Sequence, residues 1–146
     1  MEKILISACL LGQNCRYDGQ SKTYEPIQQL MNRQDILLIP ICPEQAGGLA
    51  TPRDPAERQG QQVVTCNGKN VTQQYHQGAR QALRLAKLYG CKRAILKEKS
   101  PSCGHGKIYD GTFTRTLTRG NGVTAELLEK EGIKIIGETQ VEAVSR

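Results

Sequence analysis

Several residue types and patterns are scarce or absent in this chain of 146 residues. It has no tryptophan and one phenylalanine, so its core must be aliphatic. No apolar run approaches the roughly 18 residues that a membrane helix needs, and the first apolar stretch is shorter than a signal-peptide core. Runs of basic residues interleaved with aromatic ones are also missing. These absences favour a cytoplasmic protein and predict neither a membrane nor a nucleic acid as its partner.

The length and charge set further bounds. The chain is long enough for an ordinary core, and we expect residues 1–146 to form a single α/β domain. The net charge is +6 and the isoelectric point is near 9.1. A solvated basic surface explains this charge most simply, and attraction to anionic ligands such as phosphate groups is the sharper interpretation. No pattern predicts an oligomeric state.

Short apolar segments alternate with helical patterns along the chain. We expect strands at residues 3–7, 36–41, 93–97 and 133–136. The alternation predicts an α/β fold, a Rossmann-like parallel sheet flanked by helices, with the active site at the carboxyl ends of its strands. Residues 36–41 are apolar throughout, as is typical of a strand covered on both faces.

The helices are predicted from capping residues and apolar periodicity. Ser21 or Thr23 is expected to cap the first helix, which places Met31 in the core. Thr72 is expected to cap the longest helix, which ends at Gly90, and the last helix is expected to open near residue 122 and close at residue 132.

Turn residues predict the loops and hairpins. The segment 42–60 is rich in glycine and proline, which predicts a long functional loop. The Asn-Gly pair at 67–68 predicts a hairpin between residues 63–66 and 70–71. The Asp-Gly pair at 110–111 predicts a small hairpin or turn within residues 108–113.

Three cysteines come directly after predicted strands. Cys9 follows the first strand, Cys42 the second, and Cys103 lies in the Ser-Pro-Ser-Cys-Gly turn after the third. The carboxyl ends of parallel strands line one crevice of an open sheet, where ligands bind. These cysteines are therefore expected to converge although they lie far apart in sequence.

The cysteine spacing leaves several chemistries open. A reducing compartment argues against structural disulfides, and no C-x-x-C pair indicates a zinc ribbon or a ferredoxin. Three distant thiolates suit a four-iron cluster with one open iron, a structural zinc site with Cys15 or His105 as the fourth ligand, or a metal-free catalytic thiolate. Cys66 and Cys91 are interpreted as core residues. Cys15 is intermediate between a core cysteine and a cysteine of the site.

Polar residues beside the cysteines are candidates for catalysis. Glu44 lies two residues after Cys42, where a carboxylate can act as a general base for water or pair with a nearby arginine. Ser100 and Ser102 flank the third cysteine. Their hydroxyls can donate hydrogen bonds to a substrate or cap local backbone groups.

The chain resembles the family that includes the thiouracil desulfidases, over nearly its whole length. The motifs that carry the resemblance occur in order, and they are Ser7-Ala8-Cys9-Leu10-Leu11-Gly12, Cys15-Arg16-Tyr17-Asp18-Gly19, Cys42-Pro43-Glu44, Gly47-Gly48-Leu49 with Pro52-Arg53, Lys97-Glu98 with Ser100-Pro101-Ser102-Cys103-Gly104, and Tyr109-Asp110-Gly111-Thr112-Phe113. Family members of known activity convert 2-thiouracil or related thiolated pyrimidines to the oxo base and sulfide.

The resemblance implies a cofactor and a mechanism. A [4Fe-4S] cluster is held by three cysteines that match Cys9, Cys42 and Cys103. A glutamate and a serine assist, and Glu44 and Ser100 match them, with Ser102 as a further candidate. The iron without a protein ligand takes the thiocarbonyl sulfur while Glu44 deprotonates water, which requires no net electron transfer.

The implied function is therefore an enzyme, a non-redox desulfidase acting on a small thiolated pyrimidine. Two alternatives remain on the residues alone. One is a non-catalytic zinc or cluster protein. The other is a metal-free cysteine enzyme or a small-molecule binding module.

Overall fold

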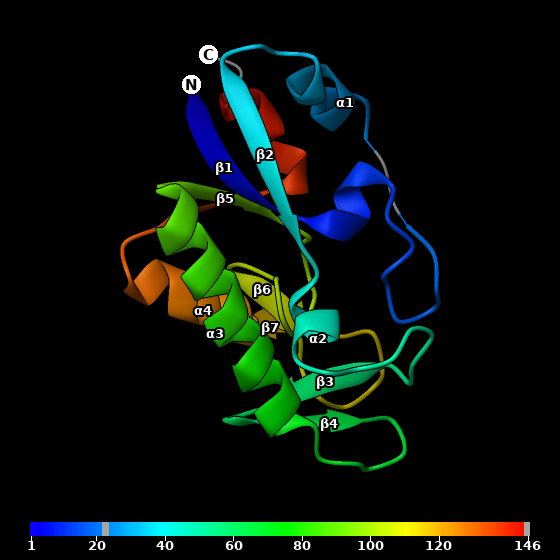
Figure 1. The fold of residues 1–146 in the computed structure, drawn as a ribbon. Coiled ribbons are helices and arrows are strands. Elements are labelled where there is room, and N and C mark those ends of the chain that lie inside the picture. The colour runs from blue at the N-terminus through cyan, green and yellow to red at the C-terminus, as the bar shows by residue number, and fades with distance from the viewer. Residues whose placement is uncertain (22–23, 145–146) are drawn as a thin grey trace.

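The computed structural model describes residues 1–21 and 24–144. Its central sheet has four parallel strands in the order β2-β1-β5-β8 (Figure 1). The strands are β1 (Glu2–Ser7), β2 (Ile36–Ile41), β5 (Arg93–Leu96) and β8 (Lys134–Gly137). This arrangement confirms the predicted α/β class with a parallel sheet flanked by helices.

Helices cover both faces of the sheet. Successive strand residues point to opposite faces, so neighbouring residues of β1 pack against different helices. Ile4 and Ile6 pack in one apolar cluster with α1 (Glu25–Met31) and the 3₁₀ helices η1 (Ala8–Leu11) and η2 (Glu138–Ala143). Leu5 packs in a second cluster on the other face, with α3 (Thr72–Tyr89) and α4 (Val123–Lys130). Figure 1 shows α3 and α4 side by side on that face.

The short helix α2 (Pro43–Ala46) lies against the middle of α3 and has no apolar side chains at the closest contact. A Cβ added at Gly78 would lie 2.7 Å from the carbonyl carbon of Pro43, and one added at Gly47 would lie 2.9 Å from that of Gln74. Both separations are shorter than real Cβ contacts. Glycine at these two positions therefore brings α2, and the residues it carries, onto the backbone of α3.

Two small antiparallel hairpins lie below the carboxyl edge of the sheet. They are formed by β3 (Ala56–Gln59) with β4 (Gln62–Thr65) and by β6 (Lys107–Tyr109) with β7 (Leu117–Arg119). The predicted long loop 42–60 therefore contains α2 and β3. The chain does reverse at Gly68, where Val64 and Asn70 form an antiparallel bridge and the Val71 N–H donates to the Val63 carbonyl at 2.9 Å. The turn at residues 110–111 opens a longer connection to β7.

One prediction about packing is wrong. Met31 is 52% exposed, because the buried face of α1 consists of Ile27 and Leu30. Strand β2 has apolar clusters on both faces, with Ile36 in the first and Ile39 in the second, but it is an edge strand and Leu37 is 42% exposed. The edge position also explains Pro40, since a proline lacks the N–H that a strand with partners on both sides would use.

The C-terminal end of α3 is predicted correctly, and its cap is not. Gly90 ends α3 in the left-handed conformation, with φ of 69°. Val71 occupies the N-terminal cap position, and Thr72 is the first helical residue, with its hydroxyl accepting the Val63 N–H at 2.9 Å. Tyr24 occupies the cap position of α1 with no side-chain capping bond, so Ser21 does not cap it, and Thr23 lies outside the described residues. Among the described helices, none has the length and apolar character to cross a membrane.

Candidate active site

The candidate site is a cavity of about 540 Å³ at the carboxyl edge of the sheet. Three consecutive strand neighbours deliver its thiols: Cys9 in η1 after β1, Cys42 at the cap of α2 after β2, and Cys103 in the loop after β5. Glu44 and Ser100 also line the cavity, whereas Ser102 does not. The structure thus brings five of the six sequence-predicted site residues to one cavity.

The loop that carries Cys103 is locked onto the start of α4. Backbone N–H groups of Val123 and Thr124 donate to the carbonyls of Pro101 and Ser102, both at 2.8 Å. The Ser102 hydroxyl is buried against that of Thr124 at 2.8 Å. Ser102 therefore anchors the loop, and its hydroxyl faces the protein interior.

Ser100 caps local backbone groups, which is one of its two predicted roles. Its Oγ accepts the backbone N–H groups of Ser102 and Cys103, each at 3.1 Å. A serine hydroxyl also carries one proton to donate. Because Ser100 lines the cavity, that proton is available for a ligand there.

A fourth thiol, Cys15, lines the same cavity. Cys42 Sγ donates to the Cys15 carbonyl at 3.6 Å. Contact with the Cys42 thiol lowers the pKa of Cys15, contact with the Cys9 thiol and burial raise it, and the result is a pKa of about 11. Cys15 is therefore buried among the other thiols.

Two further thiols of the cavity, those of Cys42 and Cys103, are also held in the neutral form. Contact with Cys15 and burial raise the pKa of Cys42. Burial raises the pKa of Cys103 to about 12, although a hydrogen bond from Ser7 opposes this effect. These shifts are opposite to those of nucleophilic cysteines, which argues against a metal-free catalytic thiolate. A bound metal would deprotonate the thiols.

The donor set of the cavity consists of thiols, which suits a soft metal group. Thiolates are the ligands of iron–sulfur clusters. Across residues 1–21 and 24–144, no three His, Cys, Asp or Glu side chains are arranged to hold one metal ion. His105 pairs with Glu129 and does not line the cavity. The zinc alternative with His105 as a ligand is therefore wrong, and Cys9, Cys42 and Cys103 fit a cluster.

The carboxylate of Glu44 is held by two partners. Arg53 donates to its Oε2 from Nε at 3.1 Å, and Arg53 Nη2 forms an ion pair with the same oxygen at 3.0 Å. Tyr75 donates to the same oxygen at 2.9 Å. Burial and the Glu44 charge raise the pKa of Tyr75, so it remains a hydrogen-bond donor. Among the described residues Oε1 accepts no hydrogen bond, which leaves it available to a ligand.

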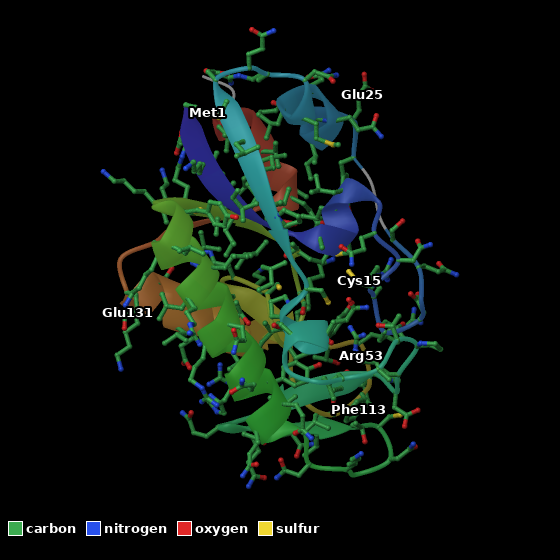
Figure 2. The ribbon with its side chains drawn as sticks, in the orientation of Figure 1. Met1, Cys15, Glu25, Arg53, Phe113 and Glu131 are labelled. Atoms are coloured by element: carbon green, nitrogen blue, oxygen red, sulfur yellow. The ribbon has the colours of Figure 1, made fainter. Side chains whose placement is uncertain are left out.

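Arg53 also connects the segments around the cavity. Its Nη2 donates to the Cys15 carbonyl at 3.0 Å and its Nη1 to Thr51 Oγ1 at 2.9 Å. Figure 2 shows Cys15, Arg53 and Phe113 along one side of the molecule, with Glu131 on the opposite side. Arg53 therefore fixes the loop of Cys15 relative to α2.

The cavity is lined by more cations than carboxylates. The cations are Arg16, Arg53, Lys97, Lys99 and Arg115, and the carboxylates are Glu44, Glu57 and Glu98. Lys97 is paired with the buried Glu138 at 3.0 Å. Part of the positive charge seen in the composition thus surrounds this cavity, which favours ligands that carry or develop negative charge.

Sequence reasoning missed several residues of the site. Tyr75 looks like part of an apolar helix stripe, and no sequence signal separates its hydroxyl from the core. Ser7 accepts the Lys97 N–H at 2.9 Å and joins the ends of β1 and β5. Glu57 lies in a strand that the loop prediction excluded. The only sequence signal for Phe113 is its place as the last residue of the Tyr-Asp-Gly-Thr-Phe motif. Of the two cysteines expected in the core, Cys91 is buried and Cys66 is exposed.

Fold and site together define an α/β protein with a thiol-lined pocket at the carboxyl ends of parallel strands. The model of the 2-thiouracil desulfurase family matches residues 4–140, and the chain belongs to this family.

Two known proteins are similar to it over nearly their whole length. One is the uncharacterised protein YbbK of Bacillus subtilis (strain 168), 41% identical over 148 residues, with 94% of this chain and 97% of that protein covered. The other is a solved structure, the [4Fe-4S]-dependent thiouracil desulfidase TudS, 48% identical with a TM-score of 0.91, covering 99% and 96% of the two chains.

Proposed function

We propose that this protein is a [4Fe-4S]-dependent desulfidase that converts 2-thiouracil, or a related thiolated pyrimidine, and water to the oxo base and sulfide. The observation that carries the proposal is the meeting of three strand-end cysteines and Glu44 at one cavity. The 48% identity to TudS supports it. A cytoplasmic location is part of the proposal, because a thiol-rich metal site suits a reducing compartment.

Cys9, Cys42 and Cys103 are the proposed cluster ligands. When bound, such a cluster supplies a soft Lewis-acidic iron for a thiocarbonyl sulfur. The walls of the cavity are contributed by segments from both hairpins and from α3, so a pyrimidine bound there is surrounded by protein.

Glu44 is the proposed general base. Two hydrogen bonds and an ion pair to Oε2 fix its carboxylate, and Oε1 is left to accept a proton from water. The hydroxide formed attacks the ring carbon, and the C–S bond breaks as Glu44 returns its proton to the departing sulfur. The hydroxyl group left on the ring carbon loses its proton to the sulfur or to solvent, which gives the oxo base and hydrogen sulfide. Atoms and charge balance without an external electron donor. Ser100 is proposed to donate its hydroxyl proton as a hydrogen bond to the ring of the substrate.

The test is anaerobic reconstitution followed by a sulfide-release assay with 2-thiouracil. Glu44→Gln keeps the size and one acceptor oxygen of the side chain but cannot take the proton, so we expect at least a hundredfold loss of turnover with unchanged iron content. Glu131→Gln, on the opposite side of the molecule, is the matched control and should retain full activity. An active Glu44→Gln enzyme would remove Glu44 from the mechanism.

A further inference from the structure

Phe113 is the single phenylalanine of the chain, and it lies outside the three apolar clusters of the described residues. Its side chain is half-buried and lines the cavity of the proposed cluster ligands. A ring that lies outside the core and at a cavity wall has apolar surface available to a ligand.

The backbone at this ring adopts an uncommon conformation. Within the described chain, the non-glycine residues with positive φ are Lys99, Phe113 and Arg115, and all three line the cavity. The φ of Phe113 is 60°, in the left-handed region that bulky side chains rarely adopt. Such conformations persist only where the surroundings hold them, and they gather at ligand sites.

The surroundings that hold Phe113 come from β3. Glu57 Oε1 accepts the backbone N–H groups of Gly111 and Phe113, at 2.9 and 3.1 Å. Gln59 Nε2 donates to the Gly111 carbonyl at 2.8 Å. Glu57 and Gln59 are two residues apart on a strand, so they lie on one face and reach the same turn. The turn is thus fixed before any ligand binds.

We propose that Phe113 is the stacking platform for the pyrimidine ring of the substrate and that Glu57 is the positioning residue that holds this platform. This inference rests on the proposed function. A planar base stacks on an aromatic face in preference to an aliphatic one, so the platform selects flat rings. Glu57 acts through the backbone of Phe113 and is not itself assigned a catalytic role.

The experiment measures inhibition of sulfide release from 2-thiouracil by two unreactive ligands, uracil and 5,6-dihydrouracil. Uracil is planar, whereas the saturated ring of dihydrouracil is puckered. Phe113→Ala and Phe113→Leu are expected to raise the inhibition constant of uracil about tenfold and that of dihydrouracil less than about twofold. Phe113→Tyr keeps the ring and is expected to stay within about twofold of the wild type for both ligands.

Glu57 is tested with a matched pair of variants. Glu57→Gln keeps an acceptor oxygen for the two N–H groups and should bind uracil like the wild type. Glu57→Ala should weaken uracil binding as much as Phe113→Ala does, and the double variant should be no worse than Phe113→Ala alone. Iron content and far-UV circular dichroism are measured for every variant, and Phe113→Leu provides the folded comparison if Phe113→Ala loses its cluster.

The outcomes separate the two proposals. A wild-type enzyme that carries a cluster but releases no sulfide overturns the proposed function and this inference with it. A wild-type enzyme that turns over, with uracil inhibition unchanged in Phe113→Leu, overturns the inference alone. Equal weakening of uracil and dihydrouracil also overturns it, because a general disturbance of the cavity would not distinguish planar from puckered rings.

Discussion

Substitution of Gly78 by alanine is expected to destabilise this protein, although a change from glycine to alanine within a helix normally stabilises it. In the interior of a helix, alanine is favoured over glycine by about 1 kcal/mol, and Gly78 lies in the middle of α3. Here the new methyl group would lie 2.7 Å from the carbonyl carbon of Pro43 and closer still to its oxygen. The atoms in the way belong to backbone, which cannot rotate aside as a side chain does.

The expected cost follows from these two opposing effects. Overpacking a close contact costs about 1–3 kcal/mol, and a backbone obstacle places this case near the upper end. After subtraction of the helix preference, we expect Gly78→Ala to lower the free energy of unfolding by about 2 kcal/mol, which for a chain of this size lowers the melting temperature by about 6 °C.

The contact also couples stability to the proposed metal site. The displaced helix α2 carries Glu44 and begins directly after Cys42, so we expect the variant to retain less iron after reconstitution. Urea unfolding of the metal-free protein and iron analysis of the reconstituted protein measure the two effects. Gln73→Ala, at an exposed position of the same helix, is the control and should change stability by less than about 0.5 kcal/mol.

Gly47→Ala tests the same contact from the other side, since its methyl group would meet the carbonyl of Gln74. The double variant should cost less than the two single variants together, because one shift of α2 relieves both clashes. A Gly78→Ala protein as stable as the wild type, with full iron content, would refute the argument that backbone approach positions α2.

Three further predictions follow from other contacts. Arg58, whose side chain is 8% exposed, donates to the carbonyls of Gly60 and Asn121, both at 2.8 Å, and to Glu126. Arg58→Ala leaves these acceptors unpaired and should lower the free energy of unfolding by about 2–3 kcal/mol. A variant that unfolds in urea like the wild type would contradict this prediction. Burial raises the pKa of Cys103 from 9.0 to about 12. The contribution of the neutral Cys103 thiol to the free energy of unfolding is therefore complete below pH 9 and disappears as the pH rises toward 12. The urea midpoint of the metal-free protein should fall over this pH range, and that of Cys103→Ala should fall less. Cys15→Ser should keep the iron content of the wild type while Cys103→Ser loses the cluster, and equal loss in both variants would make Cys15 a ligand.

Much of the sheet could be predicted from local sequence. The four strands appear as short apolar runs, and each is confirmed to within a residue or two. The carboxyl-end position of the three cysteines follows from the parallel topology alone, because every βα unit ends on the same edge of the sheet.

The errors have a common physical origin in strand order and tertiary partners. The apolar run 36–41 does not reveal that β2 is an edge strand, because strand order depends on contacts distant in sequence. The strand β3 forms in a polar, proline-flanked segment because β4 pairs with it, and its residues have little strand preference of their own.

Local sequence was enough to predict the strands, the alternation that makes the sheet parallel, and the thiols and carboxylate placed at the strand ends. Which of the neighbouring groups reach the cavity depends on the tertiary structure. It turns Ser102 toward Thr124, places Tyr75 and Arg53 on one oxygen of Glu44, and holds the Phe113 turn on Glu57. Each of these contacts joins residues at least nine positions apart, and side-chain direction at such distances is set by packing, which local pattern does not encode.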